Sequence, residues 1–243
     1  MKIIQTKPIW QQIEETVQNI PGWSPIDELY TLFLLAYISE NMDGDILEIG
    51  SWCGRSSVVL GMAAKLSHNI TKVYSVDLFP EKDDWIQNED GSWSFEVKAN
   101  NGKTLDAYKV QTVWSEPFEN AIRPVYERWN GILDAWNESI KHNGLENINI
   151  PFRGNLDMFF ENTPANLKLR LVFLDGDHGY EAVKQDILNV EKYIVQGGYI
   201  CFDDAFSGYY PDVDLAIKEL IIDSGKYDIV QQMTRKFFAA RKK

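Results

Sequence analysis

The hydrophobic and polar positions of this chain change repeatedly between two spacings. Short apolar runs alternate with segments in which apolar residues recur every three or four positions, which is typical of strands connected by helices. Parallel strands connected in this way form a sheet that is covered on both faces. The sequence therefore predicts an α/β fold with a doubly wound, mostly parallel sheet, whose buried strands lie at residues 46–49, 72–79, 148–152, 169–174 and 198–202.

The two ends of the chain lie outside this alternation. Residues 1–45 predict helices that cover one face of the sheet, and the second of them is expected to have Ser24 as its N-cap and Pro25 as its first residue. After a helix at residues 213–222, two strands follow and are expected to pair as an antiparallel hairpin at the sheet edge, at residues 227–233 and 236–240.

Composition limits the class of protein. A length of 243 residues with 44% apolar residues suits one domain with a sizeable core. The net charge is −12, and the short basic clusters at residues 235–236 and 241–243 are interpreted as flanking a terminal strand. We therefore expect no nucleic-acid partner, because binding to phosphate backbones requires clustered basic residues.

Localisation is predicted from two further features. The longest apolar run, residues 29–38, is too short to span a bilayer, and the first ten residues lack the pattern of a signal peptide. Cys53 and Cys201 are too few for a disulfide framework or a cysteine-based zinc site. These features predict a cytoplasmic protein with reduced thiols and no membrane partner.

A glycine turn between a strand and a helix is the first candidate site. Residues 46–57 read ILEIGSWCGRSS, so the turn carries Gly50 and Gly54 and opens a helix. Glycines let the backbone approach a ligand closely, and the N–H groups of a helix start can hold polar groups of that ligand. Trp52 stands where a dinucleotide fingerprint has its second glycine, which argues against NAD.

Residues 80–130 interrupt the regular pattern with a polar, loop-like segment that is rich in aromatic side chains. A long connection inside a compact domain is more often functional, so this insert predicts a substrate lid in which aromatic rings stack on a sugar or another polar ring. A satellite core or a homodimer interface explains the same aromatics equally well. They are Trp85, Trp93, Phe95, Tyr108, Trp114, Phe118, Tyr126 and Trp129.

Acidic residues follow three of the predicted strands. Asp77 ends the second strand, DGDHGYE (residues 175–181) follows the fourth, and Asp203 and Asp204 follow the fifth. Parallel strands place their carboxyl ends on one edge, so these acids should face one crevice together with His178. Acids that converge without basic partners repel one another, and a divalent cation such as Mg²⁺ or Mn²⁺ resolves the repulsion.

Together, the acid that heads the glycine turn, the G-x-x-x-G spacing and Asp77 resemble the S-adenosylmethionine (SAM) site of class I methyltransferases, which have a Rossmann-like fold. Residues 46–205 are most similar to the metal-dependent catechol-type O-methyltransferases, and the end of the chain is similar to macrocin-type sugar O-methyltransferases. The resemblance implies that Asp77 binds the ribose and that Asn155 and Leu156 contact the adenine. It places the remaining cofactor contacts at Glu48, Gly50, Trp52, Gly54, Ser56 and Asp175.

The resemblance also implies a mechanism. Asp175, Asp203 and Asp204 match the metal ligands of these families, and His178 stands where the catechol-type enzymes have a general-base lysine. In this prediction the metal binds a hydroxyl and an adjacent oxygen of a small molecule such as a sugar or catechol, and His178 removes the proton. Histidine can accept a proton at neutral pH, which suits this role.

Simpler explanations exist for several of these residues. His178 can be a surface residue at a helix start, and one of the acids at 203–204 can cap a loop. Asp177 is interpreted as the N-cap of the next helix and Glu181 as an acid of its first turn. Three alternative functions remain: an NAD-linked oxidoreductase, a non-catalytic SAM-binding protein of the same fold, and a member of the similar group that is named after cephalosporin hydroxylases.

Overall fold

The computed structural model describes residues 7–98, 102, 104–107, 112–164 and 166–243. Its centre is a seven-stranded sheet in the order β6-β2-β1-β7-β8-β10-β9. All pairs from β6 to β8 are parallel, whereas β10 is antiparallel to both of its neighbours, which confirms the predicted doubly wound sheet with a terminal hairpin. The strands are β1 (Asp45–Ile49), β2 (Val73–Asp77), β6 (Asn149–Arg153), β7 (Leu169–Leu174), β8 (Ile194–Phe202), β9 (Tyr227–Gln232) and β10 (Phe238–Lys242).

The direction of winding changes between β1 and β7, which are hydrogen-bonded neighbours at the centre of the sheet. Ligands of doubly wound sheets bind at the carboxyl ends of the strands beside such a point. Gly50 lies there with a φ of 84°, and a Cβ atom on it would lie 1.7 Å from the carbonyl oxygen of Asp175. The position therefore requires glycine.

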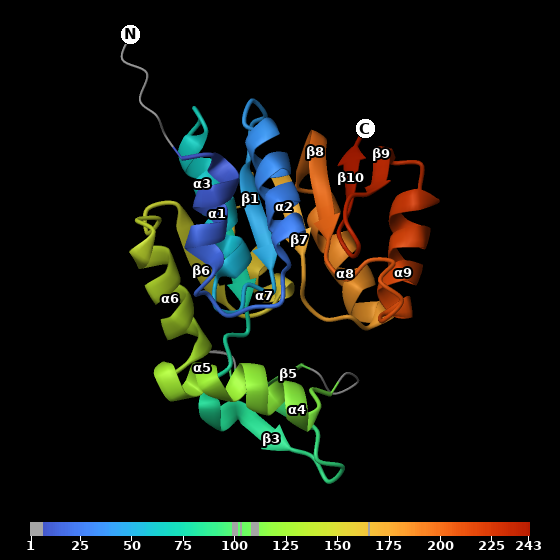
Figure 1. Ribbon diagram of the computed structural model, residues 1–243. Coiled ribbons are helices and arrows are strands. Elements are labelled where there is room, and N and C mark those ends of the chain that lie inside the picture. Colours follow the sequence, from blue (N-terminus) through green and yellow to red (C-terminus); the bar gives the residue numbers. More distant parts are fainter. Residues whose placement is uncertain (1–6, 99–101, 103, 108–111, 165) are drawn as a thin grey trace.

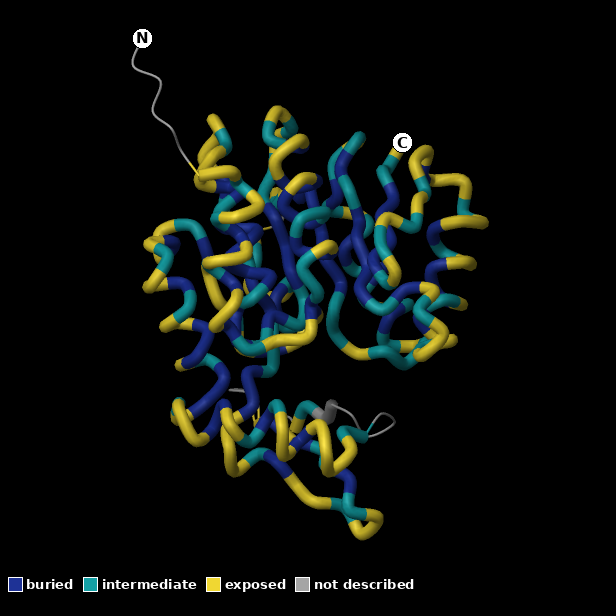
Figure 2. The backbone as a smooth tube through the Cα atoms, in the orientation of Figure 1, coloured by how far each residue is buried: buried dark blue, intermediate teal, exposed yellow. Residues whose placement is uncertain are grey.

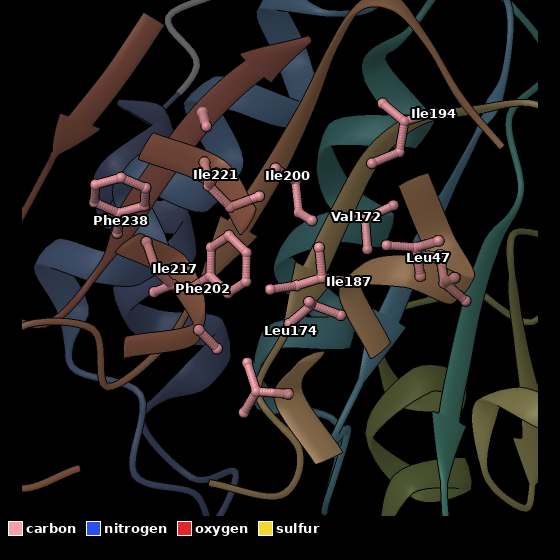
Figure 3. Packing of buried hydrophobic residues seen from close by; sticks show 14 of the residues in the cluster. Leu47, Val172, Leu174, Ile187, Ile194, Ile200, Phe202, Ile217, Ile221 and Phe238 are labelled. Carbon is pink, nitrogen blue, oxygen red and sulfur yellow. The ribbon is translucent and has the colours of Figure 1, made fainter. Parts of the chain in front are cut away.

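Each face of the sheet is covered by its own group of helices (Figure 1). In β7, Leu171 and Phe173 pack with α1, α2 and α3, whereas Val172 and Leu174 pack with α7, α8 and α9. Figure 3 shows part of the second cluster, in which Ile187 and Ile217 approach the sheet. The helices are α1 (Ile9–Val17), α2 (Ile26–Ile38), α3 (Arg55–Leu66), α6 (Ile132–His142), α7 (Leu156–Glu161), α8 (Tyr180–Glu191) and α9 (Pro211–Ile217), and α9 continues as the π-helix η3 (Lys218–Ile222).

Three boundaries differ from the sequence prediction. Helix α2 begins one residue later than expected, so Pro25 is its N-cap and the Ser24 side chain makes no cap bond. Strand β8 begins at Ile194 because the glycines expected in a preceding turn form a register shift within the strand. Helix α8 has Gly179 as its N-cap, while Asp177 accepts a hydrogen bond from the Gly179 N–H.

The insert is folded rather than loop-like, which corrects the prediction for residues 80–130 in the part that the structure describes. Its strands are short and mix aromatic with polar residues, so they lack a clear two-residue period. The elements are η1 (Lys82–Asp84), β3 (Trp85–Gln87), β4 (Trp93–Lys98), β5 (Thr104–Ala107), α4 (Ser115–Pro117), η2 (Phe118–Ile122) and α5 (Arg123–Arg128), and β3-β4-β5 form an antiparallel sheet.

The aromatic residues of the insert pack mainly on one another. The ring centroids of Trp85 and Phe95 are 4.8 Å apart, and Trp93 stacks on Phe118 at 3.9 Å. In Figure 2, short buried segments lie among exposed ones in this part of the chain, below the main sheet. Trp114 remains exposed, and Tyr108 lies outside the described residues. The insert aromatics thus belong to a buried cluster that also includes residues of α3 and α6, and the predicted roles of the insert as lid or interface stay predictions.

Two remaining expectations concern helices and thiols. Among the residues that the structure describes, no helix is both long and apolar enough to cross a membrane. Cys53 and Cys201 are free and buried.

Candidate active site at the carboxyl edge of the sheet

Two cavities adjoin the carboxyl ends of the parallel strands. The first, of about 470 Å³, is lined by residues at or just after the ends of β1, β2, β6 and β7, by helix α8, and by Phe95, Thr104 and Leu105 of the insert. The second, of about 670 Å³, is lined by the glycine turn, the segment before α2, the insert, and the ends of β7 and β8. Gly50, Asp77 and Asp175 line both cavities, so the two spaces meet at these residues.

The first cavity contains the residues predicted to bind the nucleoside. Leu156 and Asn155 line it after β6, and the Asn155 side chain caps α7 by accepting a hydrogen bond from the Met158 N–H at 3.1 Å. Asp186 of α8 lines the same cavity. Burial, together with the charges of Asp177 and Asp157, raises the pKa of Asp186 to about 7.

Asp77 is held by the backbone at the junction of the cavities. One carboxylate oxygen accepts a hydrogen bond from the Trp52 N–H at 2.9 Å, and the other accepts one from the Phe79 N–H at 2.6 Å. Both donor residues have a positive φ of 44°. Burial raises the pKa of Asp77, while these N–H groups act in the opposite direction. A carboxylate has about four lone-pair positions, so Asp77 has acceptor capacity left for a ligand.

Glu48 and Gly54 lie beneath the turn and line neither cavity. Glu48 is fully buried and accepts a hydrogen bond from Ser75 Oγ at 3.0 Å and another from Ser57 Oγ. A Cβ on Gly54, whose φ is 89°, would lie 3.0 Å from the Trp136 ring. Direct cofactor contacts by these two residues are therefore not supported, because a buried polar network and a tryptophan ring hold them below the surface. Ser56 and Trp52 do line the second cavity.

The second cavity brings together the acids and the histidine that the strand order predicts. Asp175, His178, Asp203 and Asp204 all line it. His178 stacks on Tyr210 with centroids 4.1 Å apart, and its Nε2 lies 3.0 Å from Asp204 Oδ2. Burial alone would raise the pKa of Asp204, but His178 and Lys236 hold it below its usual value. The arrangement places a paired histidine and carboxylate at the cavity wall.

Sequence reasoning missed Glu28, which reaches the same cluster from the first turn of α2. Its side chain is fully buried, and neither carboxyl oxygen has a hydrogen-bonding partner in the part of the chain that the structure describes. Burial, followed by the charge of Asp203, raises the pKa of Glu28 to about 10. Burial also raises the pKa of Asp175, and Asp203 and Glu28 add to that effect. No sequence signal distinguishes Glu28, since an acid in a first helical turn is ordinary.

Lys236 was also missed, and it corrects the expectation that the acids have no basic partner. This residue follows β9, and its Nζ lies 2.7 Å from Asp203 Oδ2, 3.3 Å from Asp204 Oδ1 and 4.0 Å from Glu28 Oε2. Among the described residues, no group of three or more His, Cys, Asp or Glu side chains is arranged to hold a metal ion. The predicted Mg²⁺ or Mn²⁺ site at Asp175, Asp203 and Asp204 therefore does not fit, because an ammonium lies between two of its carboxylates.

Aromatic side chains form another part of the second cavity. Trp23 and Trp52 lie with ring centroids 5.5 Å apart, and Trp114 of the insert reaches the same space. The segment that carries Trp23 is fixed by Arg55, whose guanidinium donates hydrogen bonds to the carbonyl oxygens of Val17, Ile20 and Ser24. The lining of the cavity thus combines aromatic rings with charged groups.

A comparison with sequence families supports the same interpretation of the site. The family model described as "Methyltransferase domain" matches residues 47–205, which is more than half of the chain. The protein belongs to this methyltransferase family, and its fold and glycine turn are those of a class I SAM-dependent methyltransferase. This result favours the methyltransferase interpretation over an NAD-linked oxidoreductase.

One curated relative is "Uncharacterized protein R132" of Acanthamoeba polyphaga mimivirus, which is 41% identical over 61 residues. The match spans 24% of this chain and 27% of that protein. The relative therefore supports local sequence similarity only.

Solved O-methyltransferases share the fold. NovP has a TM-score of 0.58 and 18% identity, over 89% of this chain and 80% of that chain. The enzyme from Bacillus cereus, solved in complex with S-adenosylhomocysteine (SAH), has a TM-score of 0.57 and 18% identity, over 99% and 94% of the chains. CalS11, titled a TDP-rhamnose 3′-O-methyltransferase, has a TM-score of 0.54 and 14% identity, over 98% and 96%.

Proposed function

We propose that this protein transfers the methyl group of SAM to a hydroxyl group of a small polar molecule, with sugars as the first candidates. The observation that carries the proposal is the junction at Gly50, Asp77 and Asp175, where the first cavity meets the second. A cofactor in the first cavity would direct its methyl group across this junction, toward the histidine and carboxylates of the second.

The first cavity has the groups that a nucleoside needs. In the proposal, the free lone pairs of Asp77 accept hydrogen bonds from both ribose hydroxyls, while Leu156 and Asn155 contact the adenine. Gly50 has no side chain, so the cofactor can pass close to the backbone between the cavities. Trp52 and Ser56 contact the methionine part from the second cavity.

The reaction requires a proton acceptor beside the acceptor hydroxyl. The oxygen forms a bond to the methyl carbon as the carbon–sulfur bond breaks, and SAH leaves with the electron pair. The hydroxyl proton passes to the pair formed by His178 and Asp204, whose atoms lie 3.0 Å apart. Asp175 lies at the junction and orients the hydroxyl toward the methyl group. No step is assigned to a metal ion.

The acceptor class follows from the two kinds of side chain that line the second cavity. Trp23, Trp52 and Trp114 offer rings on which a sugar can stack, and the carboxylates of the same lining can accept hydrogen bonds from its hydroxyls. The fold that this chain shares with CalS11 is compatible with a sugar acceptor. A catechol-like diol is the second candidate, because it presents two adjacent hydroxyls on a flat ring.

The test is a turnover assay with SAM and a panel of sugars, sugar nucleotides and catechols. We expect SAH release and one O-methylated product, and a loss of roughly a hundredfold or more in turnover for His178→Gln. The matched control is His142→Gln at the end of α6, away from both cavities. A protein that binds SAM but methylates no member of the panel would support the non-catalytic alternative instead.

A further inference from the structure

We propose that the Lys236 ammonium takes the place of a divalent metal ion in this active site, so that the protein binds and orients its acceptor without a metal. The proposal rests on the proposed function, because it concerns the acceptor side of the same reaction. It assigns to Lys236 the two tasks of neutralising the carboxylates and holding the acceptor oxygen.

The position of the ammonium is the first argument. Its contacts at 2.7 Å to Asp203 and 3.3 Å to Asp204 involve the two carboxylates that follow β8, and Lys236 lines the second cavity beside Asp175. The side chain is only 12% exposed. A cation that bridges these carboxylates must occupy the space that the ammonium already fills.

The backbone holds Lys236 in this position. The Lys236 carbonyl oxygen accepts a hydrogen bond at 2.9 Å from the N–H of Ala205, the residue that follows Asp204. The turn that carries Lys236 is closed by the Met233 N–H, which donates to the Phe237 carbonyl oxygen at 2.8 Å. Gln232 adds a bond from its side-chain amide to the Ala205 carbonyl oxygen at 3.0 Å. The position of Lys236 beside the carboxylates is therefore fixed by backbone hydrogen bonds, unlike that of a flexible lysine on the surface.

The two carboxylates do not use all of the N–H donors of the ammonium. An ammonium has three N–H donors, and Asp203 Oδ2 and Asp204 Oδ1 lie within reach of two of them. Glu28 Oε2, at 4.0 Å, is too distant for a hydrogen bond. No further acceptor for the third donor is found among the described residues, so this donor is left for the acceptor oxygen in the second cavity, where a metal ion would otherwise bind that oxygen.

Lys236 contributes to the methyl transfer through a hydrogen bond and its charge. The ammonium donates a hydrogen bond to the acceptor oxygen and stabilises the negative charge that develops on it. The oxygen–carbon bond forms, the carbon–sulfur bond breaks, and the proton passes to His178 and Asp204. Lys236 keeps all of its protons, so it acts on charge and position and not as an acid.

The experiment is a Mn²⁺ titration, followed by electron paramagnetic resonance, of metal-stripped wild-type protein and the variant Lys236→Met. Methionine keeps much of the volume but removes the charge and opens the carboxylate cluster. We expect no saturable Mn²⁺ site in the wild type and binding at least about tenfold tighter in Lys236→Met. The double variant Lys236→Met/Asp203→Asn should lose the gained site.

Lys168→Met is the matched control, since Lys168 pairs with Asp43 on the exposed surface and lines neither cavity. It should bind Mn²⁺ as weakly as the wild type. A saturable Mn²⁺ site in the wild type that Asp203→Asn removes would overturn the proposal, and this holds even if Lys236→Met fails to fold. Absence of a gained site in folded Lys236→Met would overturn it as well.

A titration of the same samples with SAH separates this proposal from the proposed function. Failure of the wild type to bind SAH would refute the cofactor assignment, whereas the Mn²⁺ result reports on Lys236 alone.

Discussion

The two cavities differ in how their walls are assembled. The first is built mainly from residues at or just after strands β1, β2, β6 and β7, together with α8. The charged cluster of the second also contains Glu28 from the N-terminal helices and Lys236 from the turn before β10. A parallel sheet fixes the first kind of residue by its strand order, whereas covering elements supply the second kind. The proposed cofactor side is therefore the more predictable half, whereas the charged cluster of the second cavity depends on contacts between distant parts of the chain.

The largest effect is expected for Gly50→Ala, which adds a side-chain atom at the junction of the two cavities. The new Cβ would lie 1.7 Å from the Asp175 carbonyl oxygen, in a residue with a φ of 84°. We expect the free energy of unfolding to fall by about 3–5 kcal/mol and SAH binding to be lost. Urea denaturation and SAH titration measure the two effects.

Gly91→Ala is the matched control for that change. Gly91 has the same φ of 84°, but its added Cβ would meet no atom within 4 Å. It should lower the free energy of unfolding by only about 1 kcal/mol, through backbone strain. Equal losses in both variants would show that the close contact at Asp175 has no importance.

Asp77→Asn tests the cofactor side alone. The amide keeps the size of the side chain but can no longer accept hydrogen bonds at both ends, so SAH affinity should fall by about 2 kcal/mol, or roughly 30-fold. Asp134→Asn on the exposed face of α6 is the control. If Asp77→Asn binds SAH as the wild type does, the ribose assignment is incorrect.

Asp186→Asn tests the electrostatics of the first cavity. A carboxyl with a pKa raised to about 7 favours folding at low pH, and this contribution is lost as pH rises through 7. The variant should therefore be more stable than the wild type at pH 8 by about 1–2 kcal/mol, after allowance for solvent contact, and the advantage should disappear near pH 4. Thermal unfolding across this range measures the difference, and a constant difference would contradict the assignment.

The smallest effect on stability is expected for Trp114→Ala, which sharpens the contrast between cofactor and acceptor sides. This side chain is 61% exposed, so the free energy of unfolding should change by less than about 0.5 kcal/mol. SAH affinity should stay unchanged, while the KM for a sugar acceptor should rise by about threefold to tenfold. An unchanged KM would remove Trp114 from the acceptor site.

Most of the sheet was predictable because each strand is an apolar run with a clear end. Strand β7 occupies the predicted residues 169–174, and the acids after β2, β7 and β8 meet at the edge that parallel strands impose. The folded insert was not predictable in this way. Its short strands mix aromatic and polar residues without a regular alternation, and the buried positions are recognised only from the packing in the structure.

The partners of the acids in the charged cluster could not be predicted from the sequence. Asp203 and Asp204 were expected to need a metal ion because no basic residue is near them in the sequence. Lys236 is 33 positions from Asp203, and only the antiparallel return of β10 beside β8 brings it to 2.7 Å. Glu28 arrives from α2 by a similar long-range contact. Contacts of this kind depend on how covering elements dock, which local patterns do not encode.

Calorimetric titration of the wild-type protein with SAH, once in EDTA and once in Mg²⁺, tests the central claim most directly. The account predicts micromolar binding with the same affinity in both conditions, because the cofactor lies against Asp77 and Gly50 and the carboxylate cluster already contains its cation. Absence of binding in both conditions would contradict the assignment of the cofactor cavity, and binding that requires Mg²⁺ would contradict the role given to Lys236.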